Sequence, residues 1–308
     1  MRGRTSGNSK HKIRDALIAF MRNYRTKSNR IEMVDGCKMK IYIGTSGYSY
    51  KEWKGKFYPE KISPNEMLRF YSERFNVVEI NNTFYHMPRE NVLVSWAEQV
   101  PDDFIFALKA PQIITHLKRL RNVDEETAYL FRSLSILDGK LGPVLFQFPK
   151  SFHKDQPALK EFLDLVPGNM ICAFDFRSPT WLDGQILDLL RERKCSLCIE
   201  DMDENPANEI ISTAPWGYLR LRRSDYRDAD LSQWMKGILS QKWKRAFVFF
   251  KHEDEAKGPQ MAMRFRELTG SGLKEKMKYN YYKISLFAHI TALISIIDPV
   301  SVIHNIIL

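Results

Sequence analysis

ICAFDFR (171–177) is one of eight short apolar runs in this chain of 308 residues, and each run carries a polar or charged residue toward its end. The other seven are IYIGTSG (41–47), VVEINNTFY (77–85), FIFALKA (104–110), PVLFQFP (143–149), SLCIED (196–201), YLRLRR (218–223) and AFVFFKH (246–252). Helix-like stretches separate most of the runs, and strands that alternate with helices indicate parallel βα units. Eight such units predict an α/β protein with a single (β/α)8 barrel, in which active sites lie at the C-terminal ends of the strands.

Polar side chains share one face in five of these runs. Successive strand residues point to opposite faces, so Ala173, Asp175 and Arg177 share one face of ICAFDFR and the apolar residues between them share the other. By the same alternation, four other runs place polar residues on one face: Glu79, Asn81, Lys109, Gln147, Arg220 and Arg222. We expect this face to point into the barrel and the apolar face to pack against outer helices. The runs that begin at Ile41, Ser196 and Ala246 do not settle which face points inward.

Length and composition fit one globular domain. A barrel of ~250 residues plus extensions accounts for the length, and a hydrophobic fraction of 44% is typical of globular proteins. No apolar run reaches the ~20 residues of a membrane span, and the N-terminus does not resemble a signal peptide. The four cysteines suit a reducing compartment. We therefore expect a cytoplasmic protein that does not bind membranes.

The two ends of the chain differ in composition from its body. Residues 1–38 hold ten Lys or Arg and three Asp or Glu, whereas the 33 basic and 32 acidic residues of 39–270 leave that body at +1 of the total +10. The basic N-terminal segment has three interpretations: a disordered tail, an arm that contacts anionic partners, or translation upstream of a true start at Met39. Residues 271–308 form a surplus tail rich in Ile, Tyr and Lys. It is interpreted either as a gene-model artefact or as an extra helix on the barrel of residues 39–270.

Metal and redox motifs are weak. Cys195 and Cys198 have the spacing of such motifs, but an offset of three in or near a strand puts the two thiols on opposite faces. A site for Mn, Mg or Zn built from Glu79, Asp175, Asp201 and a histidine is an alternative, although nearby Lys and Arg residues disfavour a cation. The sequence therefore does not show whether the protein binds a metal or a cofactor.

The charged residues of the inward faces favour an anionic ligand. Arg177 and Arg220 suit bidentate recognition of a carboxylate or phosphate, and carboxylates across the mouth suit acid–base chemistry. Burial lowers the pKa of a lysine, so Lys109 suits a Schiff-base nucleophile or a proton carrier. Because cations outnumber carboxylates at these positions, we expect a small anionic substrate.

Seven longer stretches resemble one known family. They are GTSGYSYKEWKGKFYP (44–59), VVEINNTFYHMP (77–88), FALKAPQIITH (106–116), KLGPVLFQFP (140–149), AFDFRSPTW (173–181), YLRLRRSDY (218–226) and FVFFKHEDEAKGP (247–259). Together they identify residues 40–269 as similar to the YecE-like family, a domain family of unknown function. The resemblance implies a TIM-like barrel, in agreement with the eight runs, but it supplies no reaction.

The resemblance also implies positions at the barrel mouth, and this chain departs from the family at some of them. The implied positions are Glu79, Asn81, Thr83, Tyr85, Lys109, His116, Gln147, Arg177 and Arg220. Asp175 stands where the family usually has Glu, and Ser178 where it usually has His. The eighth run, which often ends in Phe-Asn-Asn, reads Phe250-Lys251-His252 here. If those positions are catalytic, we expect altered activity.

The leading interpretation is an enzyme, a hydrolase, lyase or isomerase, that acts on a small phosphate- or carboxylate-bearing substrate at the barrel mouth. Its expected catalytic residues are Glu79, Asp175 and Lys109, and its expected substrate-binding residues are Asn81, Tyr85, His116, Gln147, Arg177, Arg220, Lys251 and His252. In this picture Arg177 and Arg220 bind the anion. The alternative, less favoured, is a non-catalytic protein for nucleic acid or another ligand, which would use Tyr48, Tyr50, Trp53 and Tyr85 as exposed stacking platforms.

A substitution of Glu79 distinguishes a catalytic carboxylate from a structural one. If Glu79 is catalytic, Glu79→Gln should leave stability unchanged or improved while removing turnover. If Glu79 instead forms a buried pair with an arginine, removing its charge should cost ~3–5 kcal/mol of stability.

Overall fold

The structure is a computed structural model that describes residues 39–207, 209–251 and 254–268. Within these residues, eight parallel strands hydrogen-bond in sequence order, and β8 pairs with β1 to close the barrel. The strands are β1 (Lys40–Ser46), β2 (Val77–Ile80), β3 (Ile105–Lys109), β4 (Leu141–Phe148), β5 (Cys172–Phe176), β6 (Ser196–Asp201), β7 (Trp216–Leu221) and β8 (Arg245–Phe250). All eight runs quoted above are strands, so the predicted barrel is confirmed.

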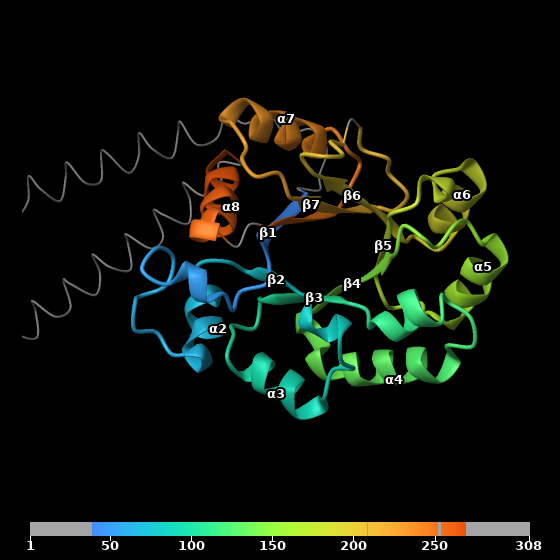
Figure 1. Ribbon diagram of the computed structural model, residues 1–308, viewed down its shortest axis with the longest axis horizontal. Helices are drawn as coiled ribbons and strands as arrows, with labels where there is room; N and C mark the ends of the chain where they lie inside the picture. The colour runs from blue at the N-terminus through green and yellow to red at the C-terminus, as the bar shows by residue number, and fades with distance from the viewer. Residues whose placement is uncertain (1–38, 208, 252–253, 269–308) are drawn as a thin grey trace, which may run out of the picture. The chain divides into compact units, whose positions relative to one another are not determined.

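Seven α-helices of the described chain surround this barrel (Figure 1). They are α2 (Pro64–Ser72), α3 (Glu90–Glu98), α4 (Asp124–Leu134), α5 (Gln156–Leu165), α6 (Gly184–Glu192), α7 (Asp228–Leu239) and α8 (Lys257–Leu268). Short helical turns are η1 (Lys51–Trp53), η2 (Asn82–Phe84), η3 (Ile113–Leu117), η4 (Ser135–Lys140), η5 (Pro179–Trp181) and η6 (Asp254–Ala256). The described part of the β6–β7 connection contains no helix, so one of the eight expected βα units lacks its helix there.

Acidic residues lie in the first turns of α2, α4 and α7. The Glu66 carboxylate accepts a hydrogen bond from the Ser63 backbone N–H at 3.0 Å, which forms a capping box at the start of α2. Asp124 and Asp228 are the first helical residues of α4 and α7, after Val123 and Arg227. Both carboxylates still lie in a first turn, where negative charge is favourable.

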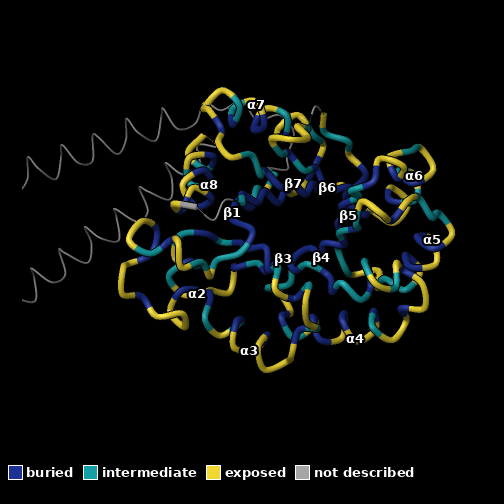
Figure 2. Tube along the Cα trace, in the orientation of Figure 1, coloured by how far each residue is buried: buried dark blue, intermediate teal, exposed yellow. Residues whose placement is uncertain are grey.

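Two separate apolar cores lie on the two sides of the barrel wall, as the alternation predicted. The larger core packs the outward strand residues against the helices, and the smaller one fills the barrel interior. Figure 2 shows the strands as the most continuously buried part of the chain. The interior core settles the three undecided runs, because it includes Tyr42, Cys198 and Phe247. Tyr42 and Phe247 stack with ring centroids 4.8 Å apart.

Cys195 and Cys198 belong to different cores, the first outside the barrel and the second inside it. Their thiols therefore lie on opposite sides of the wall, as their spacing predicted. Burial raises the pKa of Cys195 to about 12 and that of Cys198 well above its ordinary value. Both thiols are thus protonated at neutral pH, and only a thiolate is a good nucleophile or metal ligand.

None of the described helices is long and apolar enough to cross a membrane. The interpretations of residues 1–38 and 271–308 fall outside the described residues.

Residues 39–270 are expected to fold without the rest of the chain. All strands of the barrel, and the helix α8 that packs on β1 and β8, lie within these limits. Thermal unfolding of a 39–270 fragment should show one cooperative transition within a few degrees of that of the full chain. A fragment that is insoluble, or that lacks a cooperative transition, would show that a terminal segment is part of the fold.

Candidate active site

The C-terminal ends of β2–β7 bring a ring of polar side chains together inside the barrel mouth. The inward alternation of each strand ends in at least one polar residue: Glu79 on β2, Lys109 on β3, Gln147 on β4, Asp175 on β5, Glu200 on β6 and Arg220 on β7. Arg177 and Arg222 directly follow β5 and β7 in the same alternation. Of the positions that the sequence predicts for the site, the structure brings seven into one hydrogen-bonded cluster: Glu79, Asn81, Lys109, Gln147, Asp175, Arg177 and Arg220.

Arg220 is the centre of this cluster and is almost wholly buried. Its Nη2 donates to Glu79 Oε1 at 3.0 Å, and its Nη1 lies 3.2 Å from Asp175 Oδ2 and 3.3 Å from Glu200 Oε1. One guanidinium thus faces carboxylates from three strands. Its side chain is only 3% exposed, so a substrate anion would have to displace these carboxylates to reach it. We therefore assign Arg220 to the scaffold of the site and not to substrate contact.

Glu79 is fully buried, and both of its oxygens accept hydrogen bonds. Tyr218 Oη donates to Oε2 at 2.7 Å, while Arg220 and Asn81 Nδ2 donate to Oε1. Burial alone raises the pKa of Glu79, but the charge of Arg220 and the hydrogen bonds from Tyr218 and Asn81 outweigh it and lower the pKa to about 2. A carboxylate held in this way stays ionised at neutral pH, which does not favour the expected proton exchange by Glu79.

Lys109 is joined to Asp175 through a neutral amide. Its Nζ donates to Gln147 Oε1 at 2.6 Å, and Gln147 Nε2 donates to Asp175 Oδ2 at 2.6 Å. The ammonium also lies over the ring of Phe84, 3.8 Å from the ring centroid. Burial, aided by the charge of Arg220, lowers the pKa of Lys109 to about 8, although Glu79 and Asp175 oppose the shift. A sizeable neutral fraction of this amine is therefore present near neutral pH.

Two of the cations in this cluster, Arg177 and Arg222, lie nearer the solvent than the carboxylates do. The side chains of Arg177 and Arg222 are 27% and 20% exposed, whereas those of Glu200, Asp175 and Glu79 are 9%, 4% and 0% exposed. Arg177 Nη2 and Arg222 Nη1 both donate to Glu200 Oε1, at 2.8 and 2.6 Å. A molecule that enters the mouth therefore meets positive groups first.

Phe84 connects the polar cluster to a neighbouring cavity of about 750 Å³. The cavity lies between the segment that follows β2, the start of α3 and the segment that follows β3, and Phe84, Tyr85, Trp96 and Leu117 are among its lining residues. The ring of His116 packs edge-on against Phe84, with ring centroids 4.8 Å apart. Burial and the charge of Lys109 lower the pKa of His116 to about 4, so this histidine is neutral at physiological pH.

The roles of three expected substrate-binding residues, Tyr85, Lys251 and His252, stay predictions. Tyr85 is 66% exposed, lines the cavity and packs edge-on against Phe84, with ring centroids 5.2 Å apart. Lys251 directly follows β8 and is half-buried, and its role stays a prediction. His252 lies outside the described residues.

Sequence reasoning did not include Glu200, Tyr218 or Phe84 in the site. Glu200 was missed because SLCIED carries an acid on each face at its end, and the alternation alone does not say which face is inward. Tyr218 shares a face with Arg220 and Arg222 by strand alternation, but nothing in the sequence shows that its hydroxyl reaches Glu79 on β2. Phe84 lies in η2, outside the strand pattern.

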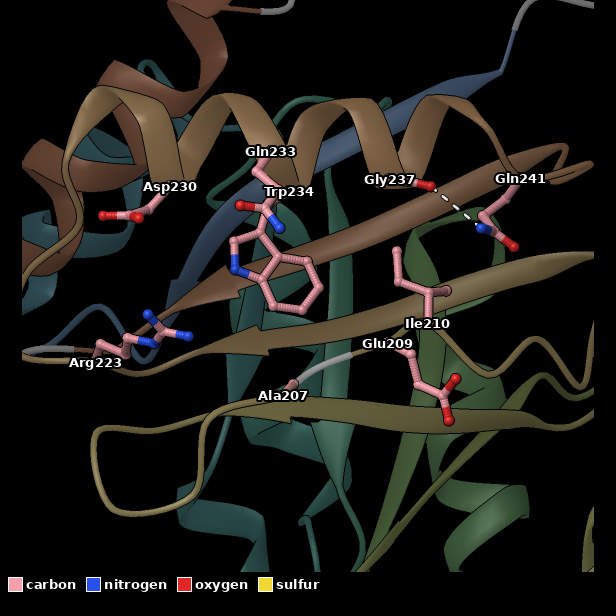
Figure 3. Close-up of a pocket in the computed structure, with 9 residues that line it drawn as sticks. All are labelled: Ala207, Glu209, Ile210, Arg223, Asp230, Gln233, Trp234, Gly237 and Gln241. Carbon is pink, nitrogen blue, oxygen red and sulfur yellow. Dashed lines mark hydrogen bonds between the residues drawn. The ribbon is translucent and has the colours of Figure 1, made fainter.

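Asp201, weighed as a metal ligand with Glu79 and Asp175, lies on the opposite side of the barrel wall, and this alternative is wrong. Its carboxylate accepts hydrogen bonds from Arg223, Tyr226 and the Trp234 indole N–H of α7. Trp234 and Arg223 line a second cavity, of about 250 Å³, beneath α7 (Figure 3). Within the described ranges, no three His, Cys, Asp or Glu side chains are grouped so that they could hold a metal ion.

The aromatic residues that follow β1 do not provide the expected exposed platforms. Trp53 is 1% exposed and packs between Tyr50, Phe57 and Tyr58. Tyr48 and Tyr50 are half-buried. Only Tyr85 of the four residues named for stacking is largely exposed, so this part of the nucleic-acid alternative is wrong.

Comparison with known proteins agrees with the family resemblance. The family model described as "Protein of unknown function DUF72" matches residues 42–280. The YecE protein of Escherichia coli K12 is 34% identical over 140 residues, which cover 45% of this chain and 49% of that protein. The YunF protein of Bacillus subtilis is 29% identical over 149 residues, 46% of this chain and 52% of that protein. The chain thus spans about half the length of the curated relatives it matches.

Solved structures share the barrel. A DUF72 family protein from Thermotoga maritima is similar with a TM-score of 0.66 and 26% identity, over 75% of this chain and 99% of that chain. A DUF72 family protein from Enterococcus faecalis has a TM-score of 0.62 at 19% identity, over 76% and 99% of the two chains, and shows the fold alone.

Proposed function

The chain belongs to the DUF72 family of unknown function, and from this premise we propose that it is an enzyme that acts on a small anionic molecule at the barrel mouth. The proposal rests on the positions of the charged groups at the mouth, where two arginines are more exposed than the carboxylates. Arg177 and Arg222 are the exposed layer, and the carboxylates lie beneath them, tied to Arg220. A phosphate or carboxylate group is expected to bind the guanidinium groups of Arg177 and Arg222, whose fork suits two parallel hydrogen bonds.

The groups that carry protons in this proposal are Lys109 and Glu200. Lys109 has a pKa of about 8, close to working pH, which is where general acid–base catalysis is most efficient. Burial and the neighbouring Asp175 raise the pKa of Glu200, against the opposing charges of Arg220, Arg177 and Arg222. Glu79, whose pKa is about 2, instead holds Arg220 in place. Asp175 orients Gln147 and thereby the Lys109 ammonium.

Phosphate and sulfate are expected to stabilise the protein, because a ligand that binds only the folded state adds about 2.7 kcal/mol at 100 times its Kd. Arg177→Ala should abolish the rise in Tm with added phosphate. The matched control is Arg191→Ala on α6, which removes an exposed arginine paired with Asp188 and should keep the phosphate response. If phosphate raises the Tm of the wild type, Arg177→Ala and Arg191→Ala equally, the anion does not bind at the barrel mouth.

A further inference from the structure

Lys109 differs from the other inward cations of the mouth in its partner. Arg177, Arg220 and Arg222 each have a carboxylate oxygen within 3.0 Å. The Lys109 Nζ has no carboxylate within ion-pair distance among the described residues, and its hydrogen bond goes to the neutral amide oxygen of Gln147. Gln147 also separates it from Asp175. The site therefore places an amine at the mouth without the counter-ion that would keep it protonated.

The surroundings of Lys109 favour an uncharged, nucleophilic amine. Burial lowers its pKa to about 8, and the charges of Arg220 and Arg177 act in the same direction. Desolvation of a lysine beside other cations is one of the ways in which proteins activate it as a nucleophile. The Lys109 side chain is half-buried and not sealed in the core, and imine formation requires a small molecule in the mouth to reach its nitrogen.

We propose that the Lys109 Nζ forms an imine with the carbonyl carbon of a small aldehyde or ketone that also carries an anionic group. The anionic group rests on the function proposed above, with Arg177 as its partner. Lys109 and Arg177 are the two ends of one chain of contacts: Lys109 Nζ lies 2.6 Å from Gln147, Gln147 lies 2.6 Å from Asp175, and Asp175 lies 3.4 Å from Arg177 Nε. One small molecule is thus expected to place its anionic group at Arg177 and its carbonyl at Lys109.

The covalent step needs no co-reactant. The nitrogen lone pair attacks the carbonyl carbon to form a C–N bond, and the carbonyl π electrons move to the oxygen. The nitrogen loses a proton to solvent and the oxygen gains one, which gives a carbinolamine. The nitrogen lone pair then expels the hydroxyl group as water, after a second proton reaches that oxygen. The protonated imine that results is a cation next to the face of Phe84, which attracts positive charge.

Reductive trapping of the full-length wild-type protein tests the proposal. Glyoxylate with cyanoborohydride converts an imine at a lysine into a stable carboxymethyl amine, which peptide mass spectrometry locates. Glycolaldehyde is the matched uncharged aldehyde of similar size. Exposed Lys160 on α5 is the internal reference. A pKa of about 8 leaves a far larger neutral fraction at pH 7 than the usual lysine pKa of ~10.4, so Lys109 should be labelled at least ~10-fold faster than Lys160.

The outcomes separate the imine from the anion site. The measured quantity is the rate of labelling at Lys109 divided by the rate at Lys160. In the wild type this ratio should be higher with glyoxylate than with glycolaldehyde. Arg177→Ala should lower the glyoxylate ratio to the value found with glycolaldehyde. If Lys109 is labelled no faster than Lys160 by either aldehyde, the imine is overturned, even if phosphate still raises Tm. If both aldehydes label Lys109 in equal preference to Lys160, the imine is supported. That result would overturn both the anionic group proposed for the carbonyl compound and the proposed anion site.

Discussion

Arg220→Met is expected to destabilise the protein by ~3–5 kcal/mol at pH 7, because it leaves three buried carboxylates without their shared cation. In the folded protein Arg220 faces Glu79, Asp175 and Glu200, and all four side chains are less than a tenth exposed. The measurement is the free energy of unfolding from chemical denaturation. Arg222→Met is the matched control, since Arg222 lies on the same face two residues later and also pairs with Glu200. Arg222 is 20% exposed, and in its absence Glu200 keeps two other arginines as partners. Arg222→Met should therefore lower the free energy of unfolding by ~1 kcal/mol or less.

The pH dependence of this difference follows from Glu79. Its folded pKa of about 2 lies below its ordinary value of 4.5, so its pairing contributes stability that is fully present above pH 4.5 and is lost as the pH falls toward 2. The stability gap between wild type and Arg220→Met should therefore be larger at pH 7 than at pH 3. Glu79→Gln should also lose several kcal/mol at pH 7, contrary to the outcome expected of a purely catalytic carboxylate. Near-wild-type stability of both variants would return Glu79 to a catalytic role.

Lys109→Met is expected to change stability in the opposite direction to Arg220→Met, and to stabilise the protein by ~1–2 kcal/mol at pH 7. The same substitution should remove any turnover that depends on the amine. The folded pKa of Lys109, about 8, lies below its ordinary value of 10.5, so keeping the ammonium charged opposes folding. This cost is fully present below pH 8 and disappears as the pH rises through 10.5. Methionine has a similar length and no charge, and water can replace the lysine at Gln147, which is partly exposed.

Unfolding of wild type and Lys109→Met at pH 7 and pH 10 provides the measurement. The advantage of the variant should shrink between the two pH values. Lys160→Met, at an exposed position of α5, should change stability by a few tenths of a kcal/mol at either pH. A variant that is less stable than wild type at pH 7 would show that Lys109 is a structural cation, and it would also weaken the case for a nucleophilic amine.

Their different partners explain why two cations of one site should respond in opposite directions. Arg220 is compensated by carboxylates from three strands, whereas the hydrogen bond of Lys109 goes to a neutral amide. Active sites often retain groups that oppose folding, because their reactivity depends on incomplete compensation. The pair of variants therefore distinguishes the scaffold of the site from its reactive part.

Patterns within single strands are enough to predict the barrel and most of the positions of its polar ring. Strand alternation has a period of two and requires only local residues, so ICAFDFR was sufficient to place Asp175 and Arg177 on one face. The apolar residues between them pack outward, as predicted. Where both faces of a run carry similar residues, as in SLCIED, the same local rule does not decide which face points inward, and only the folded chain places Glu200 inside the barrel and Asp201 outside it.

The pairing of the charges depends on the closed barrel and not on the local pattern. Arg220 Nη2 and Glu79 Oε1 belong to residues 141 positions apart, on strands that are not neighbours in the barrel, and they meet because the barrel closes. Closure also decides that Arg220 is buried beneath Arg177 and Arg222, although all three arginines have the same alternation in the sequence. Pairing energy and pKa depend on burial and on distances of a few ångströms between such strands. A local pattern identifies the residues of the mouth, but it does not contain those distances, so the division into scaffold and reactive groups required the folded chain.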